Sequence, residues 1–174
     1  MLVNLTDILS SENLVIHKMI EIELDSIDYL TEKFVLIEKE PLNLTLTNMG
    51  SKKVLIEGKI RLVLRMNCDR CLKDVNIVFD LALSRMVVAP GEEKADEDEE
   101  EQSFMDKYHL DVDELVYSEI MMNWPMKVLC AESCKGICKK CGNDLNDGDC
   151  GCDTFVPDPR MAVIKDIFKG NKEV

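Results

Sequence analysis

Apolar and polar residues alternate with a period of two over two neighbouring stretches of the chain, 53–66 and 75–83. In the first stretch one parity carries Lys, Arg and Glu, while the other is apolar: Val54, Ile56, Ile60, Leu62, Leu64 and Met66. Such alternation is typical of a strand with one buried face. The two stretches therefore predict a long antiparallel hairpin, and shorter runs predict further strands at 17–24, 33–38 and 41–47.

Two helices are expected after the strands. Asp111 is a good N-cap and Glu114, three residues later, favours a capping box. Leu115, Ile120 and Met122 form an imperfect helical stripe, which Pro125 ends because it disfavours helical backbone at the preceding residue. A second, short helix is predicted to begin at Asp158-Pro159 and to end at Gly170.

These elements predict an α+β fold: an antiparallel, β-rich N-terminal body with a helix, a Cys-rich zinc-ribbon-like segment and a short C-terminal helix. The expected organisation is a β-rich body at 1–90 and an acidic disordered loop at 91–103. Region 104–174 would contain the helix, the metal-binding segment and the C-terminal helix packed on the body.

Charge is concentrated in one place. Residues 92–101 hold eight acids and one lysine, in a chain of net charge -13. Such a run is either a solvated loop that repels itself or an interaction tail for a basic partner. An acidic chain is poorly suited to non-specific nucleic-acid binding, which needs clustered Lys and Arg.

Eight cysteines carry the clearest chemistry: Cys68, Cys71, Cys130, Cys134, Cys138, Cys141, Cys150 and Cys152. Eight thiolates suffice for two tetrahedral metal sites, which can make a short, loop-rich segment fold. Zinc is the default, and two structural Zn²⁺ ions are expected. An iron–sulfur cluster uses the same ligands and stays an alternative.

Other interpretations of the cysteines fit less well. A disulfide framework needs an oxidising compartment, but the N-terminus lacks the basic region of a signal peptide and no apolar run is long enough to span a membrane. We therefore expect a cytoplasmic protein with reduced thiols and no membrane partner. No βαβ pattern surrounds Cys68-Asp-Arg-Cys71, which argues against a thioredoxin-like redox motif.

Two groupings of the cysteines are conceivable. In the favoured one, Cys68, Cys71, Cys130 and Cys134 form one site, and Cys138, Cys141, Cys150 and Cys152 form a compact second site. The first site would then staple the segment after Trp124-Pro125 onto the hairpin tip. In the alternative, the hairpin pair joins a later knuckle such as Cys138/Cys141.

Catalytic motifs are missing from the sequence. There is no phosphate-binding loop or nucleophile elbow, and His17 and His109 are isolated. Four-cysteine sites also leave a metal no open position for water. We therefore expect no enzyme, neither a nuclease nor a thiol oxidoreductase, and no small-molecule substrate.

Basic residues lie on or beside the metal knuckles. They could form a small face for RNA or a partner, or they could merely offset the negative charge of the thiolates. These candidate contact residues are Arg70, Lys73, Lys135, Lys139 and Lys140, with Arg160 as a further candidate.

The arrangement of these motifs resembles the YceD-type large-subunit ribosomal RNA accumulation family. The resemblance covers about 55–170 and rests on the following motifs: Cys68-Asp-Arg-Cys71-Leu72, Glu119 to Pro125, Cys130-x3-Cys134-x-Gly136-x-Cys138-x2-Cys141-Gly142-x2-Leu145-Asn146, Cys150-x-Cys152 and Asp158-Pro159-Arg160. Some members of that family lack the distal cysteine block, which agrees with a separate second site.

The resemblance implies a bacterial cytosolic protein, also found in plastids, that is needed for accumulation of 23S rRNA. The expected function is a non-enzymatic factor in 50S biogenesis whose partner is a large-subunit precursor, through 23S rRNA, a basic ribosomal protein or both. The alternative is a zinc-stapled adaptor or chaperone for a basic ribosomal protein, with no direct RNA contact.

Overall fold

The computed structural model describes residues 1–88 and 103–152. The acidic run at 92–101 and the expected C-terminal helix, with Arg160, lie outside these ranges. Within them the chain forms an antiparallel, β-rich body with few helices, followed by a Cys-rich segment, so that the α+β description is compatible with the structure.

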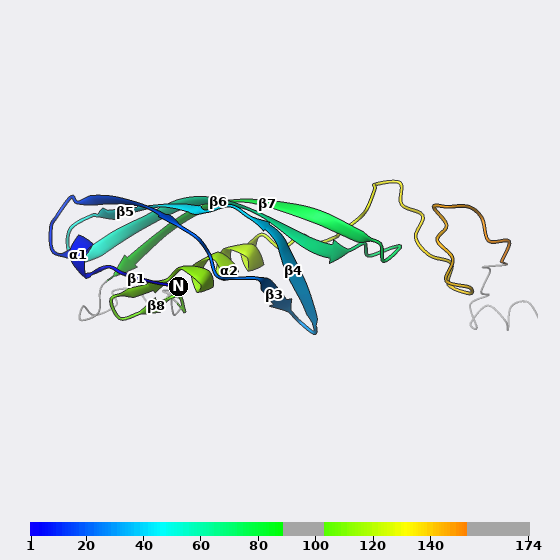
Figure 1. The fold of residues 1–174 in the computed structure, drawn as a ribbon, viewed down its shortest axis with the longest axis horizontal. Coiled ribbons are helices and arrows are strands. Elements are labelled where there is room, and N and C mark those ends of the chain that lie inside the picture. Colours follow the sequence, from blue (N-terminus) through cyan, green and yellow to red (C-terminus); the bar gives the residue numbers. More distant parts are fainter. Residues whose placement is uncertain (89–102, 153–174) are drawn as a thin grey trace, which may run out of the picture.

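A six-stranded antiparallel sheet forms the body (Figure 1). Its strands are β2 (Val15–Ile20), β3 (Ser26–Tyr29), β4 (Glu32–Lys39), β5 (Leu42–Asn48), β6 (Lys53–Asn67) and β7 (Asp74–Val88). The order is β2-β5-β6-β4-β3, with β7 on the other edge of β6. Strand β6 is the central strand of the sheet. Along one of its edges its first half pairs with β5 and its second half with β4, and β7 pairs with the whole of its other edge.

The long hairpin predicted from the alternation is confirmed as β6 and β7, each of 15 residues. All six apolar positions expected on the inner face of β6 are buried, Ile60 being the most exposed at 5%. Their charged neighbours of opposite parity, including Lys59 and Arg61, are exposed. Period-two burial thus fixes the register of this hairpin, since a slip of one residue would turn its charges into the core.

A second, three-stranded sheet was not predicted. It has the order β1-β9-β8, with β1 at Leu2–Asn4, β8 at Met105–Asp106 and β9 at His109–Asp111. A short helix, α1 (Thr6–Leu9), follows β1. The apolar residues of these elements join those of the large sheet and of α2 (Val112–Met122) in one hydrophobic core.

The helix α2 begins as predicted, because the Asp111 side chain accepts hydrogen bonds from the backbone N–H groups of Asp113 and Glu114. The capping-box half of the prediction is wrong. The Glu114 carboxylate accepts from the Ser103 hydroxyl instead, and the Asp111 N–H donates to the Phe104 carbonyl. These bonds tie the helix start to the strand segment before it.

The prediction that Met122 belongs to the apolar stripe of α2 is also wrong. Met122 is 59% exposed, whereas Glu119 is buried and pairs with Arg85 of β7 at 3.0 Å. A carboxylate replaces an apolar side chain at this inner position because an arginine from the sheet reaches it.

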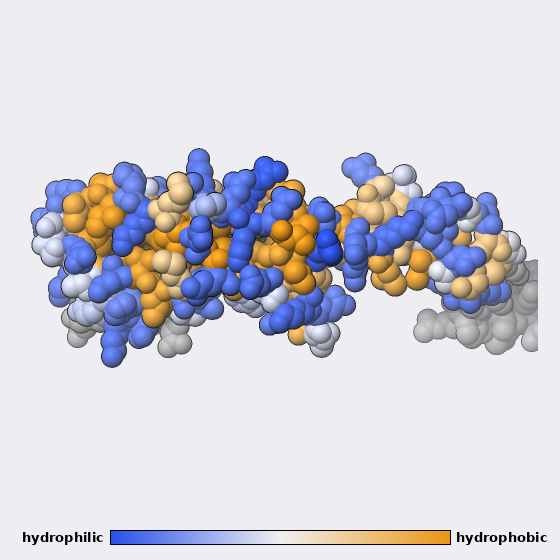
Figure 2. Space-filling model, viewed as in Figure 1, coloured by the Kyte–Doolittle hydropathy of each residue, from blue (hydrophilic) through white to orange (hydrophobic). Residues whose placement is uncertain are grey.

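The Cys-rich segment projects from the end of the body beyond the tip of the β6–β7 hairpin (Figure 1). Apolar surface is visible at the end of the body from which it projects (Figure 2). None of the helices in the described ranges is long and apolar enough to cross a membrane.

Candidate metal centres

The first cysteine group joins two distant parts of the chain. Cys68 and Cys71 lie in the turn between β6 and β7, and Cys130 and Cys134 lie in the segment after α2. Their four Sγ atoms lie within 4.8 Å of one another. The second group brings together the Sγ atoms of Cys138, Cys141, Cys150 and Cys152 within the same limit. The favoured grouping is therefore the one that the structure forms.

The sulfur spacing fits a tetrahedral metal ion. Metal–sulfur bonds of about 2.3 Å in a tetrahedron place the sulfurs about 3.8 Å apart. The Sγ atoms of Cys68 and Cys134 are 3.9 Å apart, and those of Cys71 and Cys130 are 3.5 Å apart. A disulfide needs about 2.05 Å, and all eight cysteines are free. The donor sets suit zinc, and they suit iron equally well.

Both C-x2-C knuckles have the same backbone geometry. In the first, the Leu72 N–H donates to the Cys68 carbonyl at 2.9 Å and the Cys68 N–H donates to the Lys73 carbonyl at 2.8 Å. In the second, the Gly142 N–H donates to the Cys138 carbonyl at 2.9 Å and the Cys138 N–H to the Asn143 carbonyl at 2.8 Å. Leu72 and Gly142 hold equivalent left-handed positions, with φ of 61° and 75°.

These knuckles favour a thiolate at their first cysteine. Burial raises the pKa of Cys68, but backbone N–H groups, those of Cys71 and Arg70 foremost, donate to its sulfur and bring the pKa down to about 6. The N–H groups of Cys141 and Lys140 and the Cys150 thiol lower the pKa of Cys138 to about 6 in the same way. A thiolate that already accepts amide hydrogen bonds is well prepared as a metal ligand.

In each group another cysteine has a raised pKa. Hydrogen bonds with the Cys71 and Cys134 side chains raise the pKa of Cys130 to about 12. The side chains of Cys141 and Cys150 likewise raise the pKa of Cys152 to about 12. Four thiols this close ionise together only when a cation compensates their charge, which is the chemistry of a metal site.

Asp69 fastens the segment after the helix to the hairpin tip. Its carboxylate accepts the Val128 N–H at 2.8 Å, and its own N–H donates to the Val128 carbonyl at 2.9 Å. This pair of bonds brings Cys130 and Cys134 to the first site. The predicted stapling of the chain after Trp124-Pro125 is thus present in the structure.

The two candidate metal centres also contact each other. The Ile137 N–H donates to the Arg70 carbonyl at 3.0 Å, and the Asn146 side-chain amide donates to Cys134 Sγ at 3.4 Å. Gly136 has a φ of 83°, and a Cβ there would lie only 2.9 Å from the Arg70 carbonyl oxygen. Gly136 and Asn146 were visible in the cysteine motif, but their role was not, because spacing alone says nothing of what the backbone approaches.

The basic candidate residues divide into two sets. Arg70 donates to the Cys134 carbonyl at 2.6 Å, and Lys73 pairs with Asp144 at 2.7 Å and with Asp147 at 3.5 Å. The hydrogen bond to Asp144 raises the pKa of Lys73, and the same bond lowers the pKa of Asp144. Arg70 therefore joins the two halves of the first centre, and Lys73 connects the first centre to the loop of the second.

The other set faces solvent. Lys135, Lys139 and Lys140 are exposed on the loop of the second site. All three lie between Cys134 and Cys141 in the chain, and no side chain of the described residues forms an ion pair with them. They stay candidates for contact with a partner.

Comparison with known proteins places this geometry in context. Searches of curated proteins and of solved structures returned no match. The sequence profile of one family, described as large ribosomal RNA subunit accumulation protein YceD, matches residues 56–168, a range that spans most of β6, the hairpin tip and both cysteine groups. The match covers well over half of the chain, and the chain therefore belongs to the YceD family.

Proposed function

We propose that this protein is a non-enzymatic factor in biogenesis of the large (50S) ribosomal subunit, required for accumulation of 23S rRNA. The family match carries the proposal, since the family description names accumulation of large-subunit rRNA. Two structural zinc ions would occupy the four-cysteine groups. Four thiolates saturate a tetrahedral ion, which supports a structural role for the metal and argues against hydrolysis.

The protein would act in the cytoplasm on a precursor of the large subunit. The exposed lysines beside the second metal site would make the contact with rRNA; they are Lys135, Lys139 and Lys140. A few cations on a loop held by a metal ion suit one RNA site better than general phosphate binding.

A second candidate function is an adaptor or chaperone for a basic ribosomal protein, without RNA contact. One observation favours it: Arg70 and Lys73 are engaged within the chain, which leaves the knuckles less positive than their sequence suggests. The acidic run at 92–101 would then attract the partner.

The test is the ratio of 23S to 16S rRNA, with gradient profiles of ribosomal particles, in cells depleted of the protein. We expect a selective fall in 23S rRNA and in mature 50S particles, and rescue by the intact chain. A normal ratio would overturn the proposal.

Two variants then separate the candidate functions. Replacing Lys139 and Lys140 by Glu should abolish rescue and RNA footprints if these lysines contact RNA. Deleting 92–101 should abolish rescue if the protein is an adaptor, and the intact chain should then leave no RNA footprint.

A further inference from the structure

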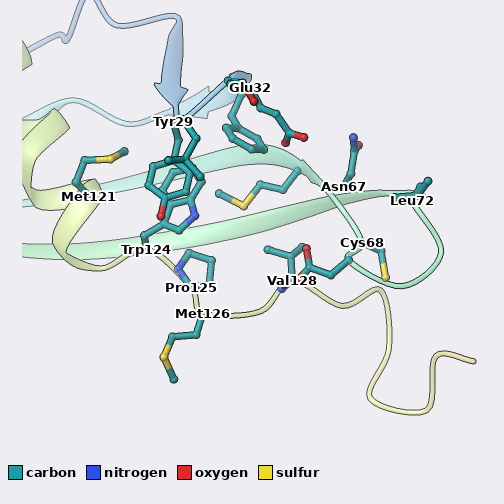
Figure 3. A pocket seen from close by; sticks show the side chains of 15 residues that line it. Tyr29, Glu32, Asn67, Cys68, Leu72, Met121, Trp124, Pro125, Met126 and Val128 are labelled. Carbon is teal, nitrogen blue, oxygen red and sulfur yellow. Dashed lines mark hydrogen bonds between the residues drawn. The ribbon is translucent and has the colours of Figure 1, made fainter. Parts of the chain in front are cut away.

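A groove opens beside the first metal centre, at the end of the body (Figure 3). It has a volume of about 640 Å³ and lies between the β3–β4 turn, the β6–β7 turn and the segment after α2. The rings of Trp124 and Tyr29 stack at one end, with centroids 4.6 Å apart, and Leu72 stands at the tip of the β6–β7 hairpin. Cys68 is part of the lining, so the metal centre holds one wall in place.

The groove gathers apolar side chains that face water. Met126, Leu30 and Leu72 are 103%, 89% and 62% exposed and all line it. They are three of the four most exposed large apolar side chains in the described ranges, the other being Met19. Single exposed apolar residues are ordinary, but a group of them around one groove indicates an interaction site.

Both leucines are also held in an unfavourable backbone conformation. Leu30 has a φ of 54° and Leu72 a φ of 61°, in the left-handed region that disfavours bulky side chains. The second knuckle has Gly142 at the position equivalent to Leu72, which shows that this turn needs no side chain. A leucine that is strained and largely exposed gains little from packing inside the protein, which favours a role in contact with something outside.

Charge indicates the kind of occupant. Glu32 and Asp69 are the charged residues of the lining, and no lysine or arginine contributes to it. The chain as a whole has a net charge of -13. A phosphate backbone would be repelled here, whereas a positively charged protein segment would be attracted.

We propose that this groove binds a segment of a basic partner protein, with one large apolar side chain entering the groove and flanking Lys or Arg residues facing its acidic rim. Apolar anchors in pockets usually dominate such interfaces, and exposed Met residues adapt to the anchor's shape. The inference goes beyond the proposed function. A basic ribosomal protein would be one such partner, but binding at the groove requires no role in rRNA accumulation.

Trp124 provides the measurement, because it is the single tryptophan of the chain and lines the groove. The probes are short Trp-free peptides with a central Leu or Phe flanked by lysines, titrated into the full-length, metal-loaded protein. We expect saturable changes in Trp124 emission, and isothermal titration calorimetry gives the affinity independently. Matched peptides with Glu in place of Lys, or Ala in place of the central residue, should bind at least about tenfold more weakly.

Leu30→Gly and Leu72→Gly separate binding from folding. Glycine accepts the left-handed backbone, so both variants should keep their metal and their unfolding temperature while the affinity for the peptide falls by about tenfold or more. Met19→Ala, which removes an exposed apolar side chain outside the groove, should bind like the unchanged protein. Equal binding by all three variants would overturn the proposal.

Other occupants are distinguished in the same assay. If an oligouridine RNA without peptide changed Trp124 emission saturably, or if the Glu peptide bound as well as the Lys peptide, the partner chemistry would be wrong. If Ile164→Ser with Phe168→Ser raised peptide affinity, the chain's own C-terminal segment would compete for the groove, and the proposal would also fail. Cells depleted of the protein test the ribosomal role separately, so either result can fail alone.

Discussion

Replacing Gly136 by alanine tests how closely the second metal centre is packed on the first. Gly136 has a φ of 83°, and an added Cβ would lie 2.9 Å from the Arg70 carbonyl oxygen, a backbone atom that cannot rotate away. The matched control is Gly142→Ala. Gly142 has a similar φ of 75°, but nothing lies within 4 Å of its added Cβ.

The two variants differ by the steric contact alone. A left-handed alanine costs about 1 kcal/mol, and both variants carry that cost. In Gly136→Ala the Arg70 carbonyl must also shift, which weakens its 3.0 Å hydrogen bond from the Ile137 N–H. Losing such a bond and crowding the backbone adds about 1–2 kcal/mol. The metal affinity of Gly136→Ala should therefore be about five- to thirtyfold below that of Gly142→Ala.

Competition with a chromogenic chelator measures this difference. We expect Gly136→Ala to lose metal from the first centre at lower chelator concentration than Gly142→Ala, because Cys134 lies two residues from the altered turn. Equal metal retention by the two variants would refute the packing argument, since the left-handed backbone of alanine would then account for the whole loss of metal affinity in both.

Three further predictions follow from the contacts above. Metal analysis should find two ions per chain, with Cys68→Ser and Cys138→Ser each losing a different one; loss of the same ion by both would contradict the grouping. Asp111→Ala should lower the free energy of unfolding in urea by about 1 kcal/mol through loss of the N-cap, and an unchanged midpoint would argue against that cap. Glu119→Ala should cost about 2 kcal/mol by leaving Arg85 unpaired, and the double variant with Arg85→Ala should cost less than the two single changes together.

The cysteine grouping shows how far spacing carries an inference. The compact second site could be anticipated, because its four ligands fall within 15 residues, 138–152. The first site depended on a long-range choice, and the hydrogen bonds between Asp69 and Val128 decide it by bringing Cys130 and Cys134 to the hairpin tip. Sequence motifs cannot reveal such a contact, since nothing about either residue type requires it.

The basic residues illustrate the same limit. Arg70 and Lys73 stand beside the knuckle cysteines and, by sequence, resemble Lys139 and Lys140. In the fold, Arg70 reaches the Cys134 carbonyl and Lys73 reaches Asp144 and Asp147, so their charge is used within the chain. Only the tertiary structure distinguishes the cations that bind other parts of the chain from those that face solvent.

What the sequence determined by itself was local and periodic: the β6–β7 hairpin, the start of α2 at Asp111 and the presence of enough thiolates for two metal centres. Burial with a period of two and capping hydrogen bonds depend on residues that are close in the sequence, so both can be predicted from the sequence alone. The tertiary structure decided which cysteines meet, why position 136 needs glycine, and that Leu30 and Leu72 line the same groove. Those outcomes depend on contacts between segments far apart in the chain, and the sequence pattern of neither segment predicts such a contact.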